Sequence, residues 1–90
     1  MNSLKFNKGY FLASKGAFAN VVNMLEDGNE LIRFTGTSKS LIEEIYASTT
    51  TDLLLQKLAA LHPEKDKKML EDFLSTFLND LDELKLLQRS

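Results

Sequence analysis

The chain has 90 residues, no cysteine and a formal net charge of −2 at pH 7. This length suits a single domain with one core, and the lack of cysteine excludes disulfides and thiolate metal sites. Five basic and three acidic side chains lie in residues 1–40, whereas six basic and ten acidic side chains lie in residues 41–90. Affinity for nucleic acid comes from clustered lysine and arginine, so this balance argues against nucleic acid as the main partner.

The N-terminal segment and the hydropathy of the chain bear on its location. Met1–Phe6 lacks the apolar core of a signal peptide. No apolar run approaches the roughly 20 residues that a bilayer-spanning helix needs. We therefore expect a cytoplasmic protein that does not bind a membrane.

Strand patterns occupy the first part of the chain. A short strand is predicted over residues 10–14, and two longer ones over residues 17–25 and 30–35. The two longer segments flank Glu26-Asp27-Gly28-Asn29, which is a strong hairpin signal. The sequence therefore predicts three strands, the last two of which form a hairpin.

The register of that hairpin depends on the turn. A two-residue turn at Asp27-Gly28 would scatter the apolar residues over both faces of the sheet. A three-residue turn with a left-handed Gly28 pairs Leu25 with Asn29, and we prefer it because the buried face decides the register. This turn places four apolar side chains on one face: Val22, Met24, Ile32 and Phe34.

Helical spacing begins after Gly36, which breaks the last strand. Ser40 and Glu43 have capping-box spacing, so a first helix is predicted from Ser40 to about Ser48. A second helix begins at Thr50 or Thr51 and ends before Pro63, which cannot continue it. Its apolar stripe consists of Leu54, Leu58 and Leu61.

A third and longer helix is predicted from about Asp66 to Leu84. Its apolar stripe consists of Leu70, Leu74, Phe77, Leu81 and Leu84, widened by Met69 and Phe73 on one side and Leu78 on the other. The apolar arc spans roughly 180°, against about 100° for a helix that only covers a core. The excess has three explanations: burial on most sides in a small domain, a flank that lines a groove for a partner, or self-association.

The order of elements defines a fold class. Three strands precede three helices, so we expect an α+β domain, spanning residues 1–90, in which the helices pack on one face of a three-stranded antiparallel sheet.

Residues that carry chemistry are sparse. His62 is the only histidine, and without cysteine or a second histidine it forms no metal site or catalytic triad. The segment Gly36–Ser40 ends like a phosphate-binding loop, but positions 33 and 38 lack the required glycines. We therefore expect no enzymatic activity, no cofactor and no metal. Three lysines, Lys65, Lys67 and Lys68, form a cluster that is either solvated or able to receive acidic groups of a peptide.

Several segments together resemble the PqqD-like family, whose members are the peptide-binding domains called RiPP recognition elements. These domains serve ribosomally made, post-translationally modified peptides. The resemblance rests on Phe34-Thr35 at the end of the last strand, Ser38–Leu41, Thr50–Leu54 with Leu58, the apolar positions 74, 77, 78 and 81, and the closing Lys85-Leu86-Leu87. Lys85 stands where the family has glycine. The resemblance implies a winged-helix-like arrangement of three strands followed by three helices.

The resemblance also implies a site. In this family the leader of a precursor peptide adds a strand to the edge of the third strand, in a groove completed by the third helix. Arg33 and Lys67 are the expected charge partners of an acidic leader. The expected peptide-binding residues are Leu31, Ile32, Arg33, Phe34, Thr35, Lys67, Leu70, Glu71 and Leu74.

The function that follows is a stand-alone recognition element. It would bind a leader peptide and present the precursor to a separate modifying enzyme, such as a radical or cyclodehydrating enzyme, as a monomer or weak dimer. One alternative is a winged-helix DNA-binding regulator, which would need a basic recognition helix, although the second predicted helix offers only Lys57. The other alternative is a small dimeric subunit of a larger assembly.

Overall fold

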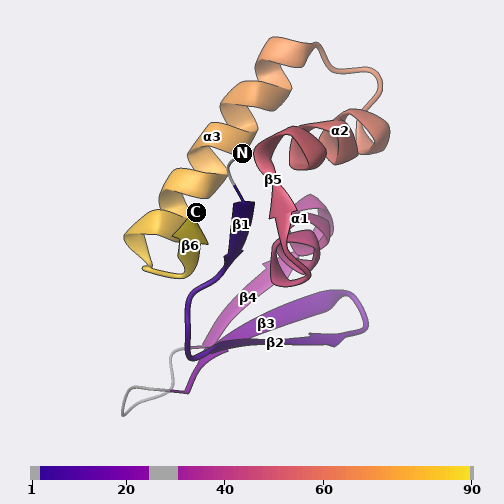
Figure 1. Ribbon diagram of the computed structural model, residues 1–90. Helices are drawn as coiled ribbons and strands as arrows, with labels where there is room; N and C mark the ends of the chain where they lie inside the picture. The colour runs from indigo at the N-terminus through magenta and orange to yellow at the C-terminus, as the bar shows by residue number, and fades with distance from the viewer. Residues whose placement is uncertain (1–2, 25–30, 90) are drawn as a thin grey trace.

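The computed structural model describes residues 3–24 and 31–89 of the chain. Figure 1 shows the strands gathered below and beside three helices. The elements in chain order are β1 (Ser3–Phe6), β2 (Tyr10–Lys15), β3 (Phe18–Asn23), β4 (Leu31–Thr35), α1 (Gly36–Tyr46), β5 (Thr49–Thr50), α2 (Thr51–Leu61), α3 (Lys67–Glu83) and β6 (Leu87–Arg89).

One sheet is formed by consecutive strands. β2, β3 and β4 pair antiparallel in that order, and β4 lies at the edge. Three helices then follow, which confirms the predicted α+β fold with its three-stranded antiparallel sheet. α1 packs against this sheet, and Ser14 of β2 donates a 2.8 Å hydrogen bond to Glu43 of α1.

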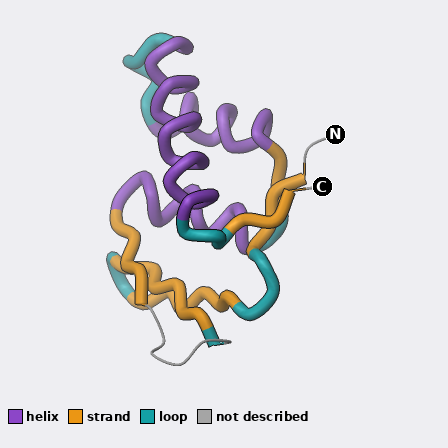
Figure 2. Tube along the Cα trace, turned by 90° about the vertical axis from the view of Figure 1, so that its left-hand side faces the viewer, coloured by secondary structure: helices purple, strands orange, loops and turns teal. Residues whose placement is uncertain are grey.

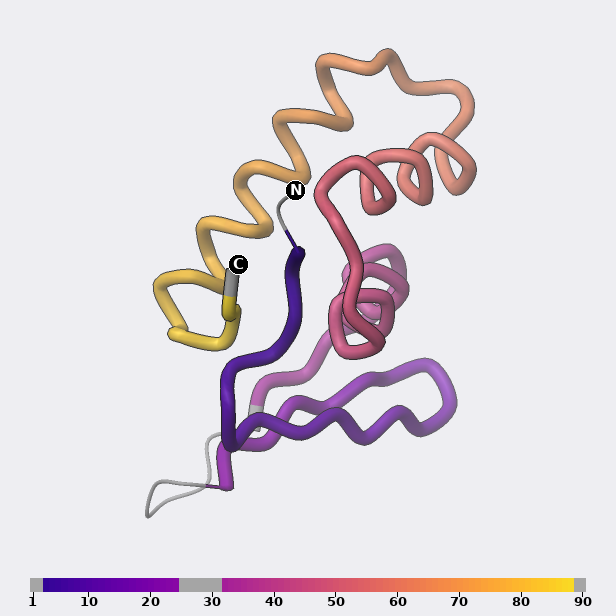
Figure 3. Tube along the Cα trace, in the orientation of Figure 1, coloured from indigo at the N-terminus to yellow at the C-terminus, as the bar shows by residue number. Residues whose placement is uncertain are grey.

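A second sheet, which no pattern in the sequence indicates, is formed by distant segments. β1 lies in the middle, pairing antiparallel with β5 on one side and with β6 on the other. β1 and β6, the first and last strands of the described chain, therefore lie side by side, as Figure 3 shows. The view in Figure 2 places this sheet beside the C-terminal end of α3, whereas the β2–β3–β4 sheet lies farther below.

The predicted register of the β3–β4 hairpin is wrong by one residue. Val21 pairs with Ile32 and Ala19 with Phe34, so Val22 and Met24 lie on the opposite face from Ile32 and Phe34. The inward residues of β3 are instead Ala19, Val21 and Asn23, which are all buried.

The physical reason for the error is a polar residue on the inward face. Asn23 is 5% exposed while Met24, which follows β3, is 61% exposed, so hydropathy alone selects the wrong alternation. The turn itself, with the expected left-handed Gly28 and the pairing of Leu25 with Asn29, lies outside the described residues.

The helix boundaries were predicted with mixed success. α1 begins at Gly36 and not at Ser40, because Gly36 adopts a φ of 58° that lets the chain pass directly from strand to helix. α2 and α3 begin where predicted. Thr50 Oγ1 accepts a hydrogen bond from the Leu53 N–H at 3.2 Å, and Asp66 Oδ1 accepts one from the Met69 N–H at 2.9 Å.

The core lies between the two sheets and the helices. Its fully buried members come from β1, β3, α1, α2 and the segment before β6: Leu4, Ala19, Val21, Leu41, Ile42, Ile45, Leu54, Leu58 and Leu86. Two residues of the predicted helix stripes are exposed instead, Leu61 by 43% and Leu84 by 40%. Both lie at the end of their helix, past the part that packs against the core.

Candidate functional site

The edge of β4 is open among the described residues. One side of the strand pairs with β3, and no described strand pairs with the other. An edge strand presents N–H and C=O groups that a further extended chain can satisfy. Ile32 and Phe34 point to the side of the sheet on which the core lies, since Phe34 is 9% exposed and Ile32 packs against the core.

Arg33 points to the other face of this sheet. Its Nε donates a 3.3 Å hydrogen bond to Asn20 Oδ1, and its guanidinium carbon lies 4.7 Å from the centre of the Phe18 ring. The cation–π contact and the cross-strand hydrogen bond hold the side chain on the outer face. The Arg33 side chain therefore lies over β3 on the outer face of the sheet, away from the side on which Phe34 meets α3.

A row of aromatic rings joins β4 to α3. The rings of Phe34 and Phe77 meet edge to face with centroids 6.2 Å apart, and Phe77 stacks on Phe73 at 6.3 Å and an angle of 8°. Phe73 is 43% exposed. The row therefore runs from the buried side of β4 to the surface of α3.

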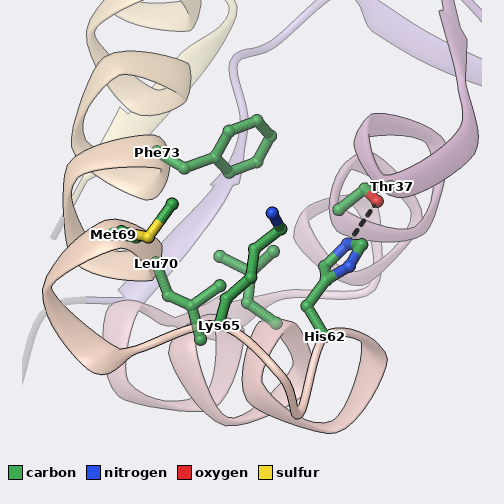
Figure 4. A pocket seen from close by; sticks show the side chains of 7 residues that line it. Thr37, His62, Lys65, Met69, Leu70 and Phe73 are labelled. Atoms are coloured by element: carbon green, nitrogen blue, oxygen red, sulfur yellow. Dashed lines mark hydrogen bonds between the residues drawn. The ribbon is translucent and has the colours of Figure 1, made fainter.

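A hollow of about 330 Å³ lies where α1, α2 and α3 meet. Phe73 forms one end of it, and Figure 4 shows the other side chains around it. The lining consists of Thr37, Leu58, His62, Lys65, Met69, Leu70 and Phe73.

Some polar groups that line the hollow have hydrogen-bond or charge partners, and one does not. Thr37 Oγ1 and His62 Nε2 are hydrogen bonded at 2.8 Å, and His62 Nδ1 lies 3.7 Å from Glu64 Oε1. The Lys65 side chain extends into the hollow (Figure 4), and within the described part of the chain no carboxylate lies within 4.0 Å of its ammonium. The hollow is thus apolar with one unpaired cation.

The predicted residues of α3 fall into two groups. Leu70 and Leu74 are 5% and 3% exposed and belong to the core, with Leu70 also lining the hollow. Lys67 and Glu71 are exposed on the flank of α3 that faces α2, where they border two shallower depressions that both include Asp52 and Leu55.

The position of each residue around the α3 axis determines which of the predicted site residues lie near β4. At 100° per residue, Lys67 and Glu71 lie on one side of the buried stripe of α3, and Met69 and Phe73 lie on the other. Phe77, the α3 residue that meets Phe34, lies toward the Phe73 side. The structure therefore brings β4 together with Phe77, on which Phe73 stacks, and it places Lys67 and Glu71 on the opposite flank of α3.

Some residues of this region had a signal in the sequence and others had none. Met69 and Phe73 widened the apolar arc of α3, and Lys65 belonged to the lysine cluster. The sequence does not indicate that Thr37 and His62 meet, because a hydrogen bond between residues 25 positions apart depends on how the helices pack.

Neither a metal-binding cluster nor a membrane-spanning helix is found among the described residues. They contain no group of three or more histidines and carboxylates arranged to hold a metal ion. No helix in the described part of the chain is long and apolar enough to cross a membrane. What this region offers is an open strand edge, an aromatic wall and an apolar hollow.

Comparison with family models, curated proteins and solved structures finds no match to this chain. The likeness to PqqD-like domains therefore rests on the residue pattern and on the order of elements.

Proposed function

We propose that this chain is a stand-alone recognition element that binds the leader of a ribosomally made precursor peptide by strand addition to β4. The observation that carries the proposal is the open edge of β4 beside the aromatic row of Phe34, Phe77 and Phe73. Backbone hydrogen bonds to an edge strand provide affinity, and adjacent side-chain pockets provide specificity.

The second part of the proposal concerns the partner enzyme. The element acts in the cytoplasm as a monomer or weak dimer without a cofactor, and it presents the precursor to a separate radical or cyclodehydrating enzyme. The outer face of the β2–β3–β4 sheet remains uncovered by the peptide in this arrangement. Phe11 and Phe18 expose 52% and 42% of their surface there, which makes this face available to the enzyme.

The alternative of DNA binding is disfavoured by one contact. The only cation of α2 is Lys57, and its Nζ lies 3.2 Å from Glu44 Oε1. A helix whose single cation is already paired offers little to a phosphate backbone. We expect any affinity for a mixed-sequence DNA duplex to lie in the nonspecific range, about 10⁻⁴–10⁻⁶ M at physiological salt.

The test uses peptides selected from a displayed library of random dodecapeptides. With a selected peptide, backbone amide shifts and slowed exchange should concentrate in residues 32–35 and in the part of α3 around Phe73 and Phe77. N-methylation of the peptide at alternate residues should abolish binding, because these amides donate to β4. N-methylation at the intervening residues should have little effect, because in a strand successive amides point to opposite sides.

Three results would contradict the proposal. Amide shifts confined to α2 would place the peptide elsewhere. Equal loss of binding from both N-methylation patterns would exclude strand pairing. Sequence-selective nanomolar binding to the DNA duplex would favour the regulator instead.

A further inference from the structure

The hollow between the three helices has the size of a side-chain pocket. Its volume is about 330 Å³, at the lower end of the range of about 300–1,000 Å³ for small-molecule sites. Leu58 and Leu70 are 0% and 5% exposed and form its buried side. A bulky apolar group entering the hollow would leave water for a surface that is already apolar.

The rim of the hollow is adaptable. Met69 and Phe73 are 53% and 43% exposed, so each has apolar surface that nothing in the described structure covers. A methionine thioether adjusts to irregular shapes and makes favourable contacts with aromatic rings. The rim therefore suits an aromatic or branched apolar side chain of a partner.

The charge at the hollow is positive. Lys65 lays its aliphatic stem along the apolar lining and carries its ammonium into the hollow (Figure 4). None of the described carboxylates around it lies within 4.0 Å of the Lys65 ammonium. Glu64 lies 3.7 Å from His62, and Asp66 caps α3. Asp52 borders the neighbouring depression that Lys65 also lines. A carboxylate of the ligand is the complement that the Lys65 ammonium lacks.

The hollow lies close to the C-terminal end of β4. Thr37, which lines it, lies two residues after the end of β4. The aromatic row from Phe34 through Phe77 ends at Phe73, which also lines it. A strand added along β4 therefore reaches the hollow when it passes Thr35.

We propose that this hollow is the specificity pocket of the peptide site. It receives one bulky apolar side chain of the bound peptide, and Lys65 binds the carboxylate of an aspartate or glutamate next to it. The inference rests on the proposed strand addition to β4. In an antiparallel added strand, the apolar-acidic pair lies N-terminal to the segment that pairs with β4, because the hollow lies beyond the C-terminal end of β4.

The first test is the sequence of peptides selected from the random dodecapeptide library. The expected consensus is one large apolar residue beside an acidic residue, at a fixed distance from the paired segment. Replacing the apolar residue by alanine in a synthetic peptide should weaken binding about 30-fold or more, as for a buried anchor. The methyl signals of Met69, Leu58 and Leu70 should shift with the parent peptide and not with the alanine peptide.

The second test is a charge reversal with a matched control. Lys65→Glu should weaken binding of the acidic peptide roughly 5- to 20-fold, because attraction is replaced by repulsion at an exposed site. Lys67→Glu makes the same change two residues away on the flank facing α2 and should have a much smaller effect. A peptide whose acidic residue is changed to lysine should bind the Lys65→Glu variant better than it binds the original protein. A double-mutant cycle over the two changes measures the interaction energy between Lys65 and the acidic residue.

The outcomes separate the two proposals. If residues 32–35 respond to the peptide but the methyl groups of the hollow do not, or if Lys65→Glu and Lys67→Glu act equally, the pocket is refuted and strand addition stands. If the hollow responds but residues 32–35 do not, strand addition is refuted. If selected peptides shift neither region, both proposals are refuted.

Discussion

β2, β3 and β4 follow one another along the chain and pair in that order, whereas β5, β1 and β6 come from residues 49–50, 3–6 and 87–89. The two sheets also differ in exposure. The first exposes a face that carries Phe11 and Phe18. The second contributes Leu4 and Leu87 to the core, with exposures of 0% and 7%.

The difference separates the sheet that holds the core together from the sheet to which we propose that a peptide binds. The second sheet joins both ends of the chain to α1 and α2, so its residues hold the helices around the core. The first sheet is formed by local pairing and retains an open edge and an uncovered face. Changes in the second sheet should therefore act on folding, whereas changes on the outer side of the first should act on binding.

The largest expected effect tests this division directly. Leu4→Ala removes a fully buried side chain from the middle strand of the second sheet and should lower the free energy of unfolding by about 2–5 kcal/mol. Phe11→Ala, on the outer face of the first sheet, should change it much less. Urea unfolding measures both. A larger loss from Phe11→Ala than from Leu4→Ala would contradict the division.

A second comparison uses two threonines in equivalent positions. Thr50 and Thr35 each end a strand and precede a helix, but only Thr50 caps its helix, by accepting the Leu53 N–H, while Thr35 makes no side-chain cap. Thr50→Ala should cost about 1 kcal/mol of unfolding free energy. Thr35→Ala should cost a few tenths at most, and equal losses in urea unfolding would contradict the assigned caps.

A third comparison concerns residues in the left-handed region. Gly16, in the turn between β2 and β3, has a φ of 60°, whereas Lys85, between α3 and β6, has a φ of 59°. The Lys85 N–H donates to the Asp82 carbonyl and the Leu86 N–H to the Leu81 carbonyl, which is the Schellman pattern that favours glycine. Lys85 is also where the resembled family has glycine.

Substitutions at these two positions should change the free energy of unfolding in opposite directions. Lys85→Gly should raise the free energy of unfolding by about 0.5–1 kcal/mol, because the strain of a left-handed lysine exceeds the added entropy of the unfolded chain. Gly16→Ala should lower it by about 1 kcal/mol. Thermal unfolding of both variants measures these two changes in the free energy of unfolding. A destabilised Lys85→Gly variant would show that the lysine side chain contributes contacts of its own.

What the sequence predicts in this protein is mostly local. The bounds of α2 and α3 follow from neighbouring residues, and these predictions are confirmed. The capping box predicted at Ser40 is wrong, because α1 already begins at Gly36. The second sheet joins segments that are far apart in the chain, so no local pattern predicts it. The β3–β4 register was wrong because Asn23 occupies an inward position where an apolar residue was expected.

In the candidate site, too, some features follow from the sequence and others depend on how distant elements pack. The edge position of β4 and the surplus apolar surface of α3 were visible in the sequence. Which flank of α3 lies toward β4 was not, since it depends on the packing of Phe77 against Phe34. Lys67 and Glu71 were chosen by their nearness in the sequence to Leu70 and lie on the other flank.

The smallest expected effect concerns the contact between the first sheet and α1. Glu43 accepts hydrogen bonds from Ser14 at 2.8 Å and from Lys39 at 3.1 Å. The Ser14 hydroxyl, and then the Lys39 ammonium, lower the pKa of Glu43 below its ordinary value of 4.5. Because the carboxylate is solvent-accessible, these contacts are worth less than about 1 kcal/mol.

The sign of the pH dependence follows from the lowered pKa. Above pH 4.5 the carboxylate is charged in both states and its folded-state contacts contribute fully. As the pH falls through the folded-state pKa, the folded protein also binds the proton and the contribution disappears. The stability advantage of the native chain over Glu43→Gln should therefore be largest near neutral pH and shrink in acid. Ser14→Ala should raise the Glu43 pKa in an NMR titration, and an unchanged titration curve would show that β2 and α1 are not coupled through this carboxylate.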